Sequence, residues 1–156
     1  RSNITVKLDV YGNTKVEFLS AFTEFYDVSR ELDACVDFHG FTSNSVVREM
    51  ISLADSTIFF RDKNRVTQAG FPGKLAESIT LGTAVIVSED SNVDRFLKYK
   101  GIHLIKKGKE IDSLQEFALK SDNEKQTIKI EALSNDAFEY RTYLENMNQF
   151  IKKLYI

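Results

Sequence analysis

Apolar segments of strand length alternate with amphipathic segments of helical period along most of this sequence. No other feature constrains the fold as strongly, because parallel strands need crossover connections and a helix is the usual crossover. The alternation predicts an α/β fold with a mostly parallel sheet flanked by helices. The predicted strands are Ile4–Val10, Val36–Phe38 followed by the turn His39-Gly40, Thr57–Phe60, Ala84–Val87 and Ile102–Ile105.

The predicted helices occupy the intervals between these strands. The first covers residues 14–28 with one apolar stripe, and the second is capped by Ser43 or Asn44. The third begins at Pro72, because a fixed φ and a missing N–H suit the start of a helix. It ends at Gly82, a residue type that commonly follows the last helical position.

The remaining segments are predicted from the same periodicity. Val93–Tyr99 reads as a short helix, and residues 107–156 form a mainly helical tail. The apolar stripe from Phe138 to Leu154 in this tail is expected to pack against the domain. The polar segment Arg61–Phe71 is long for a connection in a compact domain, which marks it as a candidate working loop. The two segments Thr57–Phe60 and Ala84–Val87 are continuously apolar, as in a sheet covered on both faces.

Composition narrows the class of protein. A chain of 156 residues with 42% apolar content suits a single domain. The balance of 21 Lys and Arg against 23 Asp and Glu excludes the basic footprint of a general nucleic-acid binder. The single cysteine, Cys35, cannot form an internal disulfide, and no apolar run approaches the roughly 20 residues that span a bilayer. We therefore expect a reducing, cytosolic setting.

The order of strands and helices predicts where a ligand binds. In open parallel sheets, ligands lie outside the carboxyl ends of the strands. The loops after the first four predicted strands share that edge. The expected site is therefore built from Gly12, Gly40, the loop Arg61–Phe71 and the start of the helix at Pro72.

Residues 69–78 combine two glycines, a lysine and a glutamate around a predicted helix start. A helix start attracts anions through unpaired N–H groups and a partial positive charge, and Lys74 adds a full charge there. Glu77 lies on the same helix face and can accept two hydrogen bonds from vicinal hydroxyls. The pattern fits a nucleotide, with phosphate at the helix start and ribose one turn further. From spacing alone, a surface ion pair between Lys74 and Glu77 explains the two residues equally well.

Other polar residues carry weaker signals. Arg61 directly follows a predicted strand and suits either a phosphate contact or a solvated strand end. His39 and His103 are the two histidines of the chain, and His39 is interpreted as a hydrogen-bonded residue at a strand end. No cluster of metal ligands is expected. Asp9 and Asp55 are interpreted as residues at the ends of elements.

Several segments match one known family, and they resemble the C-terminal, donor-binding domain of GT-B class nucleotide-sugar glycosyltransferases. The resemblance is strongest to the bacterial group 1 glycosyl transferases that build surface polysaccharides, and it covers about residues 4–106. The matching segments are Phe38-His39-Gly40, Ala54-Asp55, Arg61-Asp62-Lys63-Asn64-Arg65, Ala69-Gly70-Phe71-Pro72-Gly73-Lys74, Glu77-Ser78 and Gly82-Thr83-Ala84-Val85-Ile86.

The resemblance implies a Rossmann-like domain whose donor substrate is a UDP- or GDP-linked sugar, with no metal and no other cofactor. Lys74 is then expected to stabilise the departing diphosphate and Glu77 to bind the ribose, as the catalytic residues of a transfer that retains anomeric configuration. The further donor-binding residues that the resemblance implies are Gly12, Arg61, Gly70, Phe71, Pro72, Gly73 and Ser78.

The chain departs from the family pattern at three points. Ala69 stands where many members have a second Glu, and Ala84 stands where a Pro is usual. The family's domain opens with a strand and helix that find no match here, and the N-terminal acceptor-binding domain finds none either. We therefore expect a fragment of a longer enzyme that is inactive alone. In a doubly wound sheet the missing first strand is central.

Two other functions compete with sugar transfer. Ala69 favours a non-catalytic, degenerate domain that stabilises or regulates a partner. A flavodoxin-like receiver shares the alternation, but Phe60-Arg61 stands where a receiver has its phosphorylatable Asp. The partners expected of the enzyme are the nucleotide sugar and the acceptor-binding domain, with no nucleic acid. Its expected location is the cytoplasm, including the inner face of the membrane if the whole enzyme associates with a bilayer.

Overall fold

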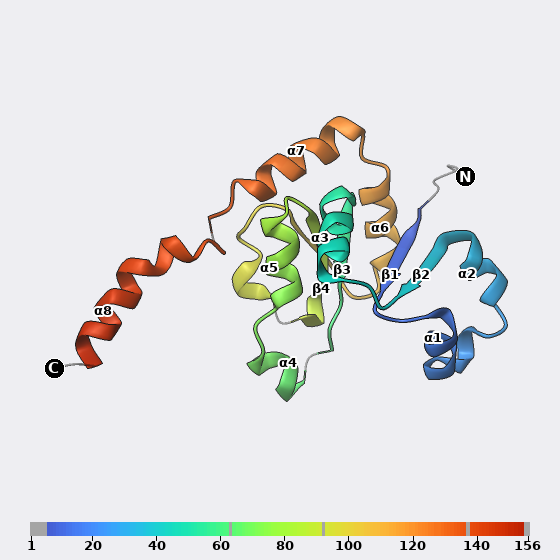
Figure 1. The fold of residues 1–156 in the computed structure, drawn as a ribbon. Helices are drawn as coiled ribbons and strands as arrows, with labels where there is room; N and C mark the ends of the chain where they lie inside the picture. Colours follow the sequence, from blue (N-terminus) through green and yellow to red (C-terminus); the bar gives the residue numbers. More distant parts are fainter. Residues whose placement is uncertain (1–5, 63, 92, 137, 155–156) are drawn as a thin grey trace. The chain divides into compact units, whose positions relative to one another are not determined.

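The computed structural model describes residues 6–62, 64–91, 93–136 and 138–154, and these form an α/β chain (Figure 1). The strands form two parallel sheets, of order β1-β2 and β3-β4-β5, with eight α-helices among the described residues. The chain divides into two compact units. Unit 1 extends to Met50 and includes Ile111–Lys120, and unit 2 contains Ile51–Glu110 and Ser121–Ile156. The α/β prediction with parallel pairing is confirmed, and a single domain over residues 1–156 stays a prediction.

Unit 1 contains the two-stranded sheet. Its strands pair in parallel, with Leu8 opposite Val36 and Val10 opposite Phe38. Ile4 and Thr5 of the predicted first strand lie outside the described residues, and the observed strand begins only at Leu8. The elements are β1 (Leu8–Tyr11), α1 (Lys15–Ala21), η1 (Thr23–Phe25), α2 (Ser29–Cys35), β2 (Val36–Gly40), α6 (Glu110–Ala118) and most of α3 (Asn44–Leu53), which runs on into unit 2.

The single helix predicted over residues 14–28 is wrong in its extent. α1 stops at Ala21 because Phe22 leaves the helical conformation, with φ −128° and ψ 74°. The following turn brings the rings of Phe22 and Phe25 to centroid distances of 5.2 and 5.5 Å from the ring of Phe18. Phe38 of β2 lies 5.3 Å from the same ring. The chain thus gathers its aromatic rings into one cluster instead of continuing the helix.

Thr14 and Glu17 form a reciprocal cap at the start of α1. The Glu17 carboxylate accepts hydrogen bonds from the backbone N–H of Thr14 at 2.7 Å and from its hydroxyl at 2.8 Å. The Thr14 hydroxyl accepts from the N–H of Glu17 at 3.2 Å. The backbone bond first, and then the hydroxyl bond, lower the pKa of Glu17 below its ordinary 4.5.

This cap makes the stability of α1 depend on pH. The unfolded chain binds the Glu17 proton more readily than the folded chain, so the contribution is present above about pH 4.5 and is lost as the pH falls through the lower folded-state value. NMR titration of the Glu17 carboxyl should give a lower midpoint in the native chain than in urea. Equal midpoints in the two states would contradict the cap.

Unit 2 contains the three-stranded sheet, with β4 between β3 and β5. The register places Thr57 opposite Val85 and Val87 opposite Leu104. The elements are β3 (Ser56–Phe59), α4 (Arg65–Ala69), α5 (Gly73–Thr80), β4 (Ala84–Ser88), η2 (Glu89–Ser91), η3 (Asp94–Phe96), β5 (Ile102–Ile105), α7 (Asp122–Leu133), η4 (Tyr140–Tyr143) and α8 (Leu144–Leu154).

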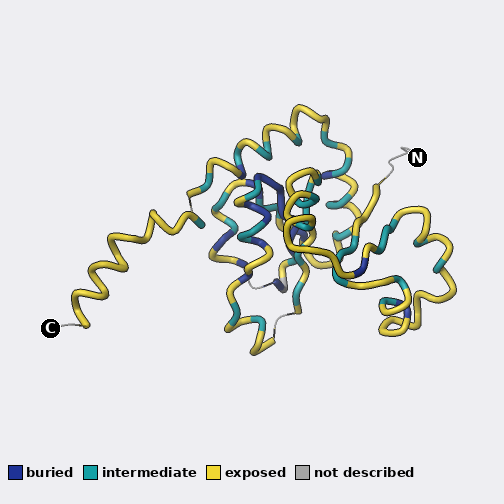
Figure 2. The backbone as a smooth tube through the Cα atoms, viewed as in Figure 1, coloured by how far each residue is buried: buried dark blue, intermediate teal, exposed yellow. Residues whose placement is uncertain are grey.

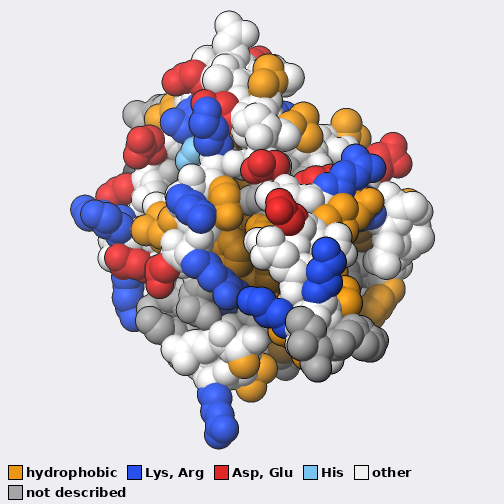
Figure 3. All heavy atoms as spheres, turned by 90° about the vertical axis from the view of Figure 1, so that its left-hand side faces the viewer, with side chains coloured by type: hydrophobic (Ala, Val, Ile, Leu, Met, Phe, Trp, Pro, Cys, Tyr) orange, Lys and Arg blue, Asp and Glu red, His pale blue; other side chains and the backbone are white. Residues whose placement is uncertain are grey.

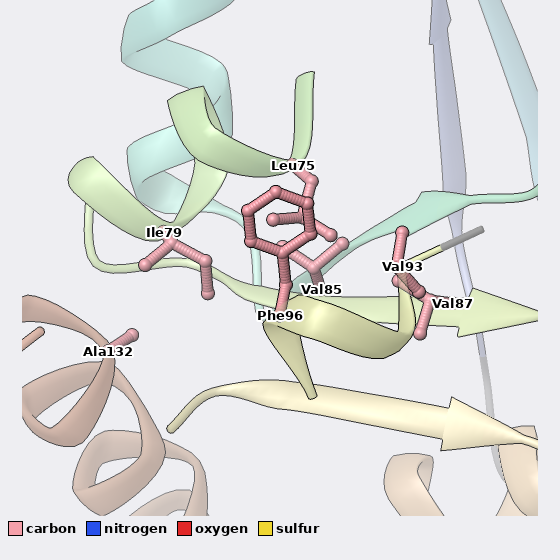
Figure 4. Packing of buried hydrophobic residues seen from close by; sticks show 7 residues of the cluster. All are labelled: Leu75, Ile79, Val85, Val87, Val93, Phe96 and Ala132. Atoms are coloured by element: carbon pink, nitrogen blue, oxygen red, sulfur yellow. The ribbon is translucent and has the colours of Figure 1, made fainter. Parts of the chain in front are cut away.

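The core of unit 2 lies between α5 and β4, where the buried part of the chain is concentrated (Figure 2). Leu75 and Ile79, one turn apart on α5, project toward Val85 of β4 (Figure 4). All three are at most 1% exposed. Phe96 of η3 and Ala132 of α7 belong to the same cluster. These contacts hold one face of α5 against the sheet, so the opposite face of the helix points away from the core.

Both predicted ends of α5 are close to the observed ones. The helix begins at Gly73, with Pro72 as the residue just before it. Gly82 follows the helix with φ +78°. Its N–H donates a hydrogen bond to Ile79 O, and the N–H of Thr83 donates one to Ser78 O. These two bonds form a Schellman motif, for which a residue with positive φ is required.

Three sequence predictions in unit 2 need correction. The strand predicted at residues 57–60 is expected to be covered on both faces, but β3 ends at Phe59, and Ile58 and Phe60 are each 45% exposed, so the face to which Ile58 points is only partly covered. The loop Arg61–Phe71 contains α4, capped by Asn64, although Lys63 lies outside the described residues. The helix predicted at residues 93–99 is reduced to the 3₁₀ turn η3, which lets the ring of Phe96 enter the core.

The C-terminal stripe packs as predicted at its first residue, Phe138, which lies against the core cluster of unit 2, whereas the prediction is wrong for α8. Phe150 and Leu154 of α8 are 63% and 65% exposed, and their neighbours on the stripe are also exposed. On the surface in view in Figure 3, hydrophobic side chains lie among charged side chains of both signs. Every helix in the described part of the chain is too short or too polar to cross a membrane.

Candidate functional site

Arg61 lies at the carboxyl end of β3, where its conformation is held by neighbouring groups. Its backbone N–H donates to the hydroxyl of Ser91 at 3.1 Å, and that hydroxyl donates to Phe59 O at 3.0 Å. The guanidinium lies 5.6 Å from the centre of the Phe59 ring. A Cβ added at Gly70 would lie 3.5 Å from Arg61 Nη2. The structure therefore brings together two of the predicted site residues, Arg61 and Gly70.

The start of α5, at Gly73, lies three residues after Gly70 and leaves backbone donors available. Pro72 has no N–H, and the N–H of Gly73 donates a hydrogen bond to Phe71 O at 2.9 Å. The first i to i−4 bond runs from Ala76 to Pro72 O at 3.1 Å, so the N–H groups of Lys74 and Leu75 have no acceptor within the helix. A Cβ added at Gly73 would meet no atom within 4 Å, so there is open space beside this turn.

Lys74 and Glu77 form the ion pair that spacing alone also predicted. Lys74 Nζ lies 3.0 Å from Glu77 Oε2. The lysine side chain is 70% exposed, whereas that of Glu77 is 22% exposed. An exposed i, i+3 pair stabilises a helix by only about 0.3 kcal/mol, so this pair contributes little to the stability of α5.

Glu77 also lines a cavity of about 350 Å³ on the flank of α5. Ala76 and Thr80 of the same helix contribute to the wall. Glu77 is the one charged residue among the described residues that line it. The rest of the wall is aromatic and comes from Phe71, Phe96, Tyr99, Phe138 and Tyr143.

Two predicted site residues have other roles in the structure. Ser78 is 2% exposed, and its hydroxyl donates to Lys74 O and accepts from Thr57 Oγ1, both at 2.9 Å. It links α5 to β3 and we leave it out of the site. Gly12 belongs to unit 1, where its N–H donates to Gly40 O at 2.7 Å and its φ is +96°. The site described here is built from unit 2 alone.

A group of potential metal ligands exists in unit 1, contrary to the sequence expectation. One ligand atom from each of Asp9, Asp37 and His39 lies within 4.8 Å of the others. His39 Nε2 lies 2.7 Å from Asp9 Oδ1, as expected of a hydrogen-bonded histidine, and its ring stacks on Tyr11. Lys7 pairs with Asp37, and this hydrogen bond lowers the pKa of the Asp37 carboxyl. Each of the three potential ligands thus already has a side-chain partner: Lys7 pairs with Asp37, and Asp9 and His39 pair with each other.

Most of the aromatic cavity wall was not predicted from the sequence. Of the five rings, only Phe71 was predicted as a site residue, and Phe138 and Tyr143 were predicted to belong to a packing stripe. These rings follow no motif, because they come from segments that are far apart in the sequence. The available signal was the recurrence of aromatic residues after the fourth strand and before the last helix.

Comparisons of the chain with models of protein families, with curated proteins and with solved structures find no match. The resemblance to glycosyltransferases therefore depends on the residues of this chain alone.

Proposed function

We propose that this chain is the nucleotide-sugar-binding part of a glycosyltransferase that transfers a hexose from a UDP- or GDP-linked donor to an acceptor. The observation that carries the proposal is the arrangement on one helix, α5. Its first turn presents Lys74 and open backbone donors, Arg61 lies close to Gly70 three residues before the helix, and the next turn of α5 places Glu77 in a cavity. This is the order of diphosphate and ribose in a nucleotide sugar.

The chemistry assigned to these residues is electrostatic. Sugar transfer breaks the bond between the anomeric carbon and a phosphate oxygen, and the electron pair leaves with the diphosphate. The acceptor oxygen forms the new bond to the anomeric carbon, and its proton passes to the departing phosphate oxygen. Lys74, Arg61 and the N–H groups at the start of α5 would stabilise the charge that develops on the diphosphate, which requires no metal ion. Glu77 would hold the donor through its ribose hydroxyls.

We propose that the enzyme also contains an acceptor-binding domain and that it works in the cytoplasm or at the inner face of the membrane.

Calorimetric titration of the chain with UDP, GDP and inorganic pyrophosphate tests the proposed function. We expect saturable binding of pyrophosphate and of at least one nucleoside diphosphate, in the micromolar to millimolar range typical of substrates. Binding should weaken as salt concentration rises, because the contacts are ionic. The absence of binding by all three compounds would reject the proposal.

The second candidate function is a non-catalytic module that binds or regulates a partner. It is favoured by Ala69, the last residue of α4, which provides no carboxylate near the donor. The two candidates differ in turnover and not in fold. Transfer or hydrolysis of a UDP- or GDP-sugar by the longer protein would exclude the second candidate, whereas nucleotide binding without turnover would favour it.

A further inference from the structure

Two carboxylates face each other across the sheet of β1 and β2 in unit 1 (Figure 1). Asp9 of β1 lies directly opposite Asp37 of β2, so their side chains lie on the same face of the sheet. The other face carries Phe38, whose ring packs against that of Phe18. Like charges directly opposite each other destabilise a pair of strands. A cation held between the two strands removes this repulsion.

His39 adds an imidazole to the two carboxylates. The register between the strands shifts before Tyr11, which lies opposite Gly40, so His39 is an extra residue of β2. A β-bulge of this kind redirects a side chain. The ring of His39 stacks on that of Tyr11, with 4.5 Å between the ring centres, and its Nε2 lies 2.7 Å from Asp9 Oδ1. The bulge and the stacking together direct this nitrogen toward the carboxylates.

The three side chains suit a divalent transition-metal ion. Their ligand atoms lie at most 4.8 Å apart. Two ligands about 2.1 Å from one ion are at most about 4.2 Å apart, so small side-chain rotations are enough to enclose an ion. Carboxylate oxygens alone suit Mg²⁺ and Ca²⁺, whereas an imidazole nitrogen favours Zn²⁺ and similar ions. The side chains of Asp9 and His39 are 40% and 37% exposed, so water can fill the remaining coordination positions.

We propose that Asp9, Asp37 and His39 bind a divalent transition-metal ion of the Zn²⁺ type, which links β1 to β2. This site does not depend on the proposed function. Lys7 pairs with Asp37, and His39 pairs with Asp9, so the ion replaces these two contacts. The side chain of Lys7 is 62% exposed and can move into solvent when the ion binds.

The ion stabilises the pairing of the two strands. Among the described residues this sheet has only β1 and β2, and a sheet of two strands is marginally stable on its own. Ligands from both strands join them through the ion, and its two positive charges compensate both carboxylates. Because the folded chain presents the ligands together, Zn²⁺ should raise the midpoint of urea unfolding and slow amide exchange in β1 and β2.

Calorimetric titration of the chelator-treated chain with Zn²⁺ tests the site. Asp37→Asn and His39→Phe each remove one ligand, and His39→Phe keeps a ring that can stack on Tyr11. Asp27→Asn is the matched control, because Asp27 is an exposed aspartate of unit 1 outside the cluster. Circular dichroism confirms that each variant is folded, and Mg²⁺ replaces Zn²⁺ in a parallel titration.

A second pair of variants tests the competition between Lys7 and the ion. Lys7→Met removes the ammonium group that pairs with Asp37 and keeps most of the side chain. Lys153→Met makes the same change of net charge at an exposed position of α8. Lys7→Met should strengthen Zn²⁺ binding about threefold, as the loss of a competing surface ion pair allows, and Lys153→Met should not.

We expect saturable binding of one Zn²⁺ per chain and no binding of Mg²⁺ at the same concentrations. Loss of an outer partner of a metal ligand weakens affinity about 10–100-fold, so loss of a ligand in Asp37→Asn or His39→Phe should weaken it at least tenfold. Asp27→Asn should bind as the unmodified chain does. The proposal is overturned if Zn²⁺ does not bind saturably, if Mg²⁺ binds as tightly, if neither ligand variant weakens binding, or if Lys7→Met and Lys153→Met have equal effects.

Discussion

Replacing Gly101 by alanine is expected to destabilise unit 2 by about 3 kcal/mol. Gly101 has φ +82°, a conformation that costs a residue with a Cβ about 1–2 kcal/mol. Its added Cβ would also lie 2.8 Å from the Cβ of Ala132 and 3.3 Å from Ile79 Cδ1. Ala132 is fully buried against the core, so α7 would have to move away from α5 and β4.

Gly108 provides the matched control for this substitution. Its φ is +78°, nearly that of Gly101, but an added Cβ would meet no atom within 4 Å. Gly108→Ala should therefore show only the backbone strain of about 1 kcal/mol. Urea unfolding of both variants, followed by circular dichroism, measures the difference between them. Equal effects of the two substitutions would contradict the close contact between position 101 and Ala132. If the contact is close, adding Ala132→Gly should partly restore the stability lost in Gly101→Ala.

Removing the two cations near the start of α5 is expected to weaken diphosphate binding about 100-fold. A hydrogen bond to a charged group contributes about 1.5–3 kcal/mol, so Arg61→Ala and Lys74→Ala should each weaken the affinity for UDP at least about tenfold. Arg61→Lys keeps the charge and loses the paired donors of the guanidinium, so its effect should be smaller than that of Arg61→Ala.

Lys153→Ala is the charge-matched control for these variants. Lys153 is an exposed lysine near the end of α8 and lies outside the cavity lining. Calorimetric titration with UDP should give the same affinity for this variant as for the unmodified chain. If Lys153→Ala weakens binding as much as Lys74→Ala does, the attraction is a general effect of net charge and not of this site.

The central part of unit 2 could be predicted from sequence because local signals agree there. Pro72 and Gly82 bound α5 through their own backbone preferences, and Ala84–Val87 reads as a buried strand on its own. In the loop before α5, the cap formed by Asn64 and Thr67 has no Glu or Gln at its third position, the usual signal of a capping box. For this reason α4 was not predicted from the sequence.

The division into two sheets and the aromatic cavity could not be predicted in the same way. Strand order depends on which edges meet in the folded chain, and β1 and β3 each read as an ordinary strand in sequence. The cavity joins α5 to Phe138 and Tyr143, which lie far from α5 along the chain, so no local pattern connects them. The exposure of α8 likewise follows from tertiary contacts, since its apolar stripe is indistinguishable from one that packs.

Assigned amide NMR spectra, recorded while UDP is added to the chain, test the binding of a diphosphate at the start of α5 most directly. We predict that the largest shift changes occur at the N–H groups of Lys74 and Leu75, with further changes at Arg61 and Glu77. Saturable shifts confined to other segments, with those of α5 unchanged, would contradict this account.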